Sequence, residues 1–197
     1  MLMSDDLSDA DKDRHEYLKN SILDEVQRTL DDRACRLAQV DKLGIVPCGV
    51  FGAPSAECIE LFRDGHYYGC ISLVQSVTEA IVRHVWQVKL CKKKAAAGEF
   101  DSNLASLHKK GLISDEVKTT MSTIWADRNT FHHLALSLSK EVRDLEQLAA
   151  EKLRLLGDVE KHFFGYDIER GTLKPHKPEL WDIQPDGNTL VYVRGGL

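Results

Sequence analysis

A run of apolar residues at helical spacing in the middle of the chain is the strongest constraint on the fold. Between residues 66 and 92 these side chains recur every three or four positions: Cys70, Val74, Val77, Ile81, Val85 and Val88. Leu73 and Ala80 widen the stripe, so the predicted helix carries apolar residues on more than one side. We therefore expect a central helix that packs against several others.

Similar spacing predicts helices through most of the remaining chain. They cover about residues 8–43, 55–65, 101–110, 114–138 and 139–157. Ser55 and Ser114 are predicted N-caps, and Gly157 is predicted to end the last helix. Residues 44–54 contain Gly44, Pro47, Gly49, Gly52 and Pro54, which predicts a loop.

The C-terminal segment has a different pattern. Residues 181–184 and 189–193 flank Pro185-Asp-Gly-Asn188, a strong turn sequence, which predicts one β-hairpin. A lone hairpin is marginal in water, so it must dock on helices or on a second subunit. The expected fold class is all-α, an up-and-down bundle of four to six helices with a small C-terminal β-hairpin. The expected parts are residues 1–43, a helix packing on or extending the bundle, 55–165, the helical core, and 166–197, the hairpin extension.

Composition and charge exclude several classes of protein. The chain of 197 residues has a formal charge of −5, five cysteines without CxxC spacing, and no apolar run long enough to cross a bilayer. These features predict a cytoplasmic protein with no membrane association. Phosphate-binding GxxxxGK[ST], GxGxxG, GxSxG and HExxH motifs are missing, so we expect no cofactor and no metal.

Arg128 occupies an unusual position in the segment 114–138. It follows Met121 and Ile124 at helical spacing, in a place where an apolar residue is expected. A guanidinium in a core costs several kcal/mol (about 3–5) without a partner. The polar row of the central helix (Gln75, Glu79 and Arg83) offers Glu79 and Gln75 as partners. The neighbouring residues Asn129, His132 and His133 add an amide and two imidazoles.

The run Arg128-Asn129-x-x-x-His133 resembles the signature of HEPN domains, an arginine followed four to six residues later by a histidine. Residues 67–88, with Glu79 inside them, look like the first core helix of that family, and residues 103–114 look like the usual approach to the motif. The resemblance covers about residues 56–160. Arg170 and His176 also have this type of spacing, but they lie beside Gly171 and Pro175 rather than in a predicted helix.

The resemblance implies a homodimer that cleaves RNA without a metal, by attack of the ribose 2′-hydroxyl on the neighbouring phosphate. Arg128 would hold that phosphate, His133 would transfer protons, and Asn129 would orient a hydrogen-bond partner. Glu79 would support Arg128, and an antitoxin or another regulatory partner would restrain the enzyme. Five lysines have two interpretations. They form either a track that contacts the RNA backbone or charged loops that only face solvent. They are Lys92, Lys93, Lys94, Lys109 and Lys110.

Two questions stay open at the level of sequence. On an ideal helix His132 lies about 40° from Arg128 and His133 about 140°, so geometry favours His132 whereas the family spacing favours His133. A bend near Phe131 would reconcile the two, and we favour His133. The alternative functions are a HEPN-like dimerising adaptor without catalysis and an unrelated helical interaction protein, for which Arg128 and Glu79 would form a structural salt bridge.

Overall fold

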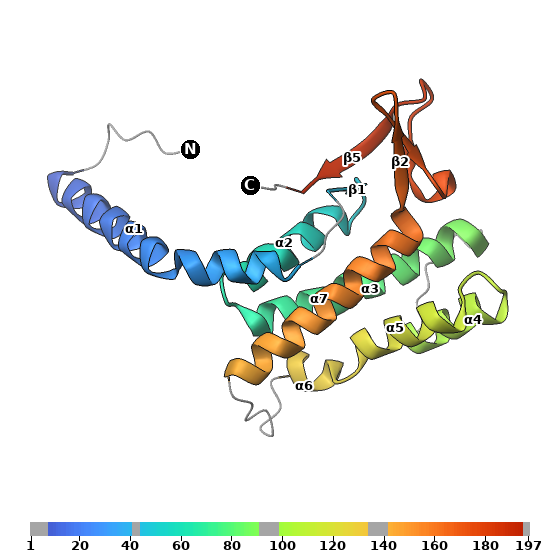
Figure 1. Cartoon of the computed structure of the whole chain (residues 1–197), viewed down its shortest axis with the longest axis horizontal. Helices are drawn as coiled ribbons and strands as arrows, with labels where there is room; N and C mark the ends of the chain where they lie inside the picture. The colour runs from blue at the N-terminus through green and yellow to red at the C-terminus, as the bar shows by residue number, and fades with distance from the viewer. Residues whose placement is uncertain (1–7, 41–43, 91–98, 134–141, 195–197) are drawn as a thin grey trace.

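Helices dominate the computed structural model, which describes residues 8–40, 44–90, 99–133 and 142–194 (Figure 1). The helices are α1 (Asp9–Ala38), α2 (Gly52–Arg63), α3 (Tyr67–Leu90), α4 (Phe100–Lys109), α5 (Asp115–Trp125), α6 (Arg128–His132) and α7 (Val142–Phe164), with a short 3₁₀ helix η2 (Pro178–Leu180). The strands are β1 (Ile45–Pro47), β2 (Tyr166–Glu169), β3 (Thr172–Pro175), β4 (Asp182–Ile183) and β5 (Thr189–Val193). The protein is therefore mostly helical with small antiparallel sheets, and the expectation of an all-α fold is corrected.

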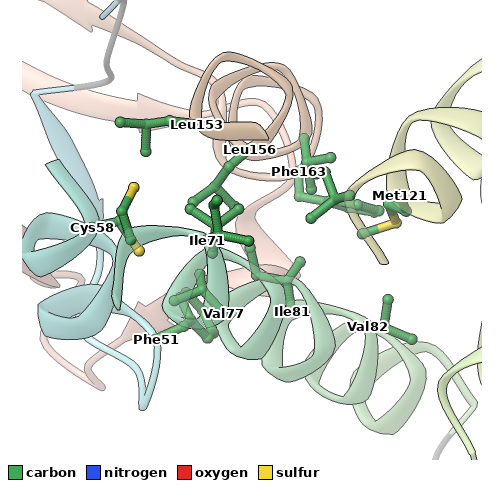
Figure 2. Close-up of a cluster of buried hydrophobic side chains, with 14 of the residues drawn as sticks. Phe51, Cys58, Ile71, Val77, Ile81, Val82, Met121, Leu153, Leu156 and Phe163 are labelled. Carbon is green, nitrogen blue, oxygen red and sulfur yellow. The ribbon is translucent and has the colours of Figure 1, made fainter. Parts of the chain in front are cut away.

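Helix α3 lies at the centre, as its apolar pattern predicts. It packs against α2 on one side and α7 on the other, and α5 packs against α7. Figure 2 shows Ile71, Val77 and Ile81 of α3 meeting side chains of the surrounding helices. Burying such side chains contributes roughly 1.5–3 kcal/mol each, so this contact region supplies most of the driving force for folding.

The predicted C-terminal hairpin is confirmed as β4 paired with β5. Its docking is also clear, because Leu180 and Trp181 just before it are buried in the helical core. Two further strand pairings were not predicted. Strand β1 lies in the stretch 44–54, which was expected to be a loop, and it pairs with β5. Strands β2 and β3 form a second hairpin.

Three predicted helix boundaries were wrong. Ser55 lies inside α2 rather than capping it, and its buried hydroxyl contacts Glu160 instead. Gly157 lies inside α7, because the apolar face continues beyond it with the buried Val159 and Phe163. Helix α5 ends at Trp125 instead of continuing to about residue 138, and residues 134–138 lie outside the described part of the chain.

A buried ion pair ties the C-terminal strand to two helices. The guanidinium of Arg194 donates to the carboxylate of Glu160 on α7 and to the hydroxyl of Ser55 on α2. Both charged side chains are only 2% exposed. The pair therefore connects α2, α7 and the end of β5 in a place where neither charge has access to water.

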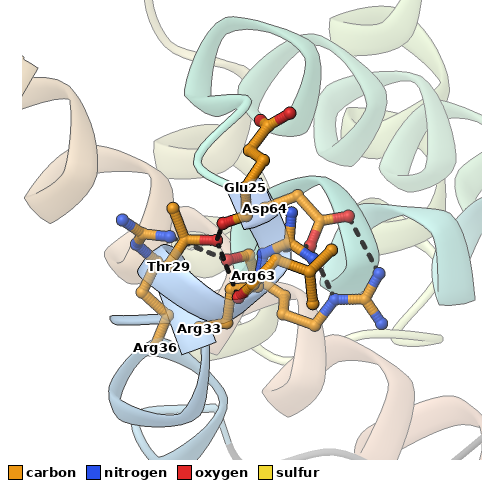
Figure 3. A network of polar contacts seen from close by, with 7 residues as sticks. Glu25, Thr29, Arg33, Arg36, Arg63 and Asp64 are labelled. Atoms are coloured by element: carbon orange, nitrogen blue, oxygen red, sulfur yellow. Dashed lines mark hydrogen bonds and ion pairs between the residues drawn. The ribbon is translucent and has the colours of Figure 1, made fainter. Parts of the chain in front are cut away.

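Helix α1 joins the rest of the protein only near its C-terminal end. Arg36 donates to the carbonyl of Arg63 at 2.8 Å, and Arg33 lies 3.6 Å from Asp64 (Figure 3). The side chains from Ala10 to Glu25 are all exposed, and Figure 1 shows this part of α1 projecting from the body. Of the described helices, none is long and apolar enough to cross a membrane.

Replacing Arg194 by alanine should lower the free energy of unfolding by about 3–5 kcal/mol, because Glu160 would be left buried without its cation. Urea unfolding followed by circular dichroism measures the change. The matched control is Arg154→Ala, which removes an exposed pair with Asp158 on α7 and should cost less than about 0.5 kcal/mol. Equal effects of the two substitutions would contradict the structural role of the buried pair.

Candidate functional site

The chain breaks its helical path immediately before Arg128. Ala126 adopts an extended conformation (φ −54°, ψ 145°), and Asp127 lies in the left-handed region with φ 62°. Aspartate is among the non-glycine residues that adopt this conformation most readily. Helix α6 then starts at Arg128, so Arg128 does not continue the apolar face of α5 as the sequence suggested.

Two buried polar side chains hold the end of α5. The amide of Gln75 on α3 donates to the carbonyls of Ile124 and Ala126, at 3.1 and 3.0 Å. The ammonium of Lys152 on α7 donates to the carbonyls of Thr123, Ile124 and Ala126, at 3.2, 2.8 and 3.1 Å. These carbonyls have no partner within the helix, and burying them unpaired would be costly. Gln75 and Lys152 thus fix where α5 stops and where Arg128 begins.

Arg128 lies between an aromatic ring and a carboxylate. Its guanidinium carbon is 4.6 Å from the centre of the Trp125 ring, and Nη2 is 3.9 Å from Oε2 of Glu79. Glu79 also forms a close pair with Arg83, one turn further along α3. The Arg128 side chain is 34% exposed, so its charged end is accessible, whereas its buried Nε has no hydrogen-bond partner in the described part of the chain.

A cleft of about 460 Å³ adjoins the guanidinium of Arg128. It is lined by Glu79, Arg83, Glu99, Phe100, Asp101, Trp125, Arg128 and Asn129. Phe100 stacks on Trp125, with ring centres 4.1 Å apart, and this pair forms the aromatic part of the wall. The lining side chains comprise three carboxylates and two guanidiniums, so charge is concentrated here but not uniformly positive.

The two histidines occupy different environments. His132 is half-buried, its Nε2 is buried without a partner among the described residues, and it hydrogen-bonds the backbone of Ser72 on α3. Burial first, and then the nearby Arg128 and His133, lower the pKa of His132 from its usual value of 6.5. His133 and Asn129 are exposed.

Helix α6 shows no bend at Phe131. The amide of His133 donates to the carbonyl of Asn129 at 3.1 Å, which is the spacing of a regular α-helix, and Phe131 is buried. Arg128 and His132 therefore lie on the same side of α6, and His133 lies about 140° from Arg128 around the helix. Within one chain, the structure brings Arg128, His132 and Glu79 together and directs His133 elsewhere.

The two described lysines of the predicted track, Lys109 and Lys110, do not lie at this site. Lys109 and Lys110 are exposed at the C-terminal end of α4, whereas Phe100, at the other end of that helix, contacts Trp125. A ten-residue helix is about 15 Å long, which separates the two lysines from Arg128. Lys92, Lys93 and Lys94 lie outside the described residues.

The sequence suggested the wrong partner for one residue that builds the site, Gln75, and gave almost no sign of another, Lys152. Gln75 was considered as a partner of Arg128, but it binds the end of α5 instead. Lys152 gave no signal apart from a charge within the apolar α7 segment, where it is 3% exposed. In the described part of the chain, no three His, Cys, Asp or Glu side chains cluster as metal ligands.

Comparison with protein-family models, with curated protein sequences and with solved structures found no match for this chain. The functional argument therefore depends on the site itself.

Replacing Lys152 by methionine should destabilise the protein by about 1–3 kcal/mol, because a charged hydrogen-bond donor to three carbonyls is lost. Amide exchange of residues 125–132 should also become faster. Arg154→Met, at an exposed position of the same helix, is the control and should cost less than about 0.5 kcal/mol. Unchanged exchange around Arg128 would show that Lys152 does not fix the end of α5.

The imidazole of His132 should titrate below pH 6.5, because burial disfavours its charged form. The unfolded chain then takes up this proton at higher pH than the folded chain, so the contribution of His132 to stability is present above pH 6.5 and is lost as the pH falls below it. An NMR titration measures the midpoint, with the signal assigned by its loss in His132→Gln. A midpoint at or above 6.5 would contradict the described environment.

Proposed function

We propose that the protein is a metal-independent endoribonuclease of the HEPN type, with an up-and-down helical core, acting as a toxin or an antiviral defence effector. The observation that carries the proposal is the break between α5 and α6. It presents Arg128 at a cleft and places two histidines in the following turn. The absence of any match to a known family leaves the proposal on this geometry and on the Arg128-Asn129-x-x-x-His133 motif.

Arg128 is assigned to binding the scissile phosphate. Its ion pair with Glu79 is long, at 3.9 Å, and the close partner of Glu79 is Arg83. A phosphate could therefore form charge-assisted hydrogen bonds with the exposed end of Arg128 while Glu79 keeps its other arginine. The Trp125 ring beneath the guanidinium limits its movement, which favours a fixed binding geometry.

His133 is assigned to proton transfer, and His132 to positioning. The buried Nε2 of His132 is inaccessible to a ribose hydroxyl, whereas His133 is exposed. In the proposed reaction the 2′-oxygen attacks phosphorus and its proton passes to a histidine, while the bond to the 5′-oxygen breaks and that oxygen receives a proton. The products are a cyclic phosphate end and a free 5′-hydroxyl.

The angle between Arg128 and His133 favours a site built by two copies. Side chains about 140° apart on one short helix cannot both face the same phosphate. In a two-fold dimer, Arg128 of one copy and His133 of the other can do so, and each dimer would then hold two such sites. The expected homodimer thus becomes a requirement of the proposed chemistry.

A second candidate function is a HEPN-like dimerising adaptor without catalysis. The observation in its favour is the lining of the cleft, where three carboxylates accompany two guanidiniums and would repel an RNA backbone. In this case the contacts of Arg128 with Glu79 and Trp125 would serve only to hold α6 against α3.

Cleavage of RNA by the purified protein in EDTA tests the proposal. Arg128→Ala and His133→Ala should each lower the rate by about a hundredfold or more, since each removes a group that acts in the transition state. The product of the wild type should carry cyclic phosphate ends. The control is the double variant Arg170→Ala/His176→Ala, which removes the second arginine–histidine pair with similar spacing and should keep full activity.

Mixing the two inactive variants tests whether two copies build one site. If Arg128 and His133 act across a dimer, half of the dimers in an equal mixture contain one intact site of two, and about a quarter of the wild-type rate returns. Sites within one chain would give no recovery. A folded wild type that leaves varied RNAs intact would exclude the nuclease and favour the adaptor.

A further inference from the structure

The projecting part of α1 carries a stripe of exposed large apolar side chains. We call residues 9–25 the arm. Tyr17, Leu18, Ile22 and Leu23 of the arm, and Leu30 beyond it, are between 48% and 72% exposed. Leu18, Ile22, Val26 and Leu30 follow one another at intervals of four residues, so they form one continuous row along the helix.

This row runs into a groove between α1 and α2. The groove has a volume of about 500 Å³. It is lined by Val26, Leu30, Arg33, Ala34 and Leu37 of α1, by Ala56, Ile59, Glu60 and Arg63 of α2, and by Arg194. The contacts of Arg33 and Arg36 with the end of α2, drawn in Figure 3, hold α1 in place on one side of it. One face of α1 is therefore apolar along most of its length and lies over α2 only at its C-terminal end.

An arm of this length needs a partner. Isolated helices of about 12–15 residues are marginal in water, because packing of an apolar face provides most of the stability of a helix. Within the described chain, the side chains from Ala10 to Glu25 are all exposed. The groove, in turn, presents apolar side chains that are open to solvent, such as the 57% exposed Leu30.

The charges of α1 select the direction of pairing with a second copy. Residues 9–25 contain six acidic and three basic side chains, a net charge of −3. Residues 26–38 contain three basic and two acidic side chains, a net charge of +1. Antiparallel pairing places the acidic arm beside the basic half, whereas parallel pairing would place two acidic arms side by side.

We propose that two copies of the chain dimerise by exchanging arms, each laying its arm antiparallel in the α1–α2 groove of the other. The row sets the register. With Leu18 of one copy beside Leu30 of the other, Ile22 lies beside Val26, and the two-fold axis passes near residue 24. Both copies then contribute the same two surfaces, an arm and a groove. This interface lies on α1 and α2, and it does not depend on the proposed nuclease activity.

Sedimentation equilibrium of the full chain tests the exchange. The wild type should self-associate, and Leu18→Glu/Ile22→Glu should raise the dissociation constant of this association at least about tenfold, because it places charges in the apolar groove. The control is Ile168→Glu, at a 63% exposed apolar position in the β2–β3 hairpin, and it should stay dimeric. Circular dichroism verifies that each variant is folded.

Disulfide trapping tests the register, in a Cys35→Ser background. Leu18→Cys/Leu30→Cys should form an intermolecular disulfide, whereas Leu18→Cys alone should not, since antiparallel pairing separates the two copies of residue 18. A monomeric wild type would overturn the proposal, as would Leu18→Glu/Ile22→Glu associating as tightly as the wild type. Efficient trapping through Leu18→Cys alone would overturn the antiparallel arrangement. RNA cleavage plays no part in these measurements, so their failure does not decide the nuclease proposal.

Discussion

The carbonyl groups at the end of α5 impose the constraint on which the arrangement around Arg128 depends. Three of them, from Thr123, Ile124 and Ala126, have no hydrogen-bond partner within the helix. They lie where α3, α5 and α7 meet, and a buried carbonyl must be hydrogen-bonded. Gln75 and Lys152 satisfy them from two different helices. Because Gln75 and Lys152 are themselves buried, their donor groups would also be costly to bury without these carbonyls as partners. The end of α5 and the packing of α3 against α7 therefore stabilise each other.

This interaction explains how an all-helical environment can hold an irregular backbone. The extended Ala126 and the left-handed Asp127 interrupt the helical path within two residues, at the carbonyls that Gln75 and Lys152 bind. The new helix keeps one apolar anchor, Phe131, in the core, and it places Arg128 and His132 beside α3 while Asn129 and His133 are exposed. A buried ion pair, Arg194 with Glu160, plays a similar part near the C-terminal end of α7, where it fixes the last strand.

The sequence predicts the parts of this structure that depend on periodicity, and fails where two segments must recognise each other. The apolar row of α3 and the turn at residues 185–188 are local signals, and both elements were predicted correctly. The break after Trp125 was missed because Met121, Ile124, Arg128 and Phe131 keep helical spacing across it. Strand β1 has three residues and forms only because β5, more than 140 positions later, pairs with it. The proximity of Arg128 to Glu79 was predicted, whereas the role of Lys152 leaves no trace in the spacing of residues.

The chemistry available to Arg128 follows from the way Glu79 is shared. One carboxylate lies beside two guanidiniums, and it pairs closely with Arg83 one helical turn away but at 3.9 Å from Arg128. The three groups together therefore carry a net charge of +1, and that charge is located at the more weakly paired arginine. An anion arriving at the cleft replaces a long contact by a bidentate one, while the carboxylate stays neutralised by Arg83. The acidic Glu99 and Asp101 line the same cleft and oppose this binding, but both side chains are exposed, so salt screens their charge. A phosphate held in direct contact with Arg128 is thus the form of anion binding that this charge arrangement favours.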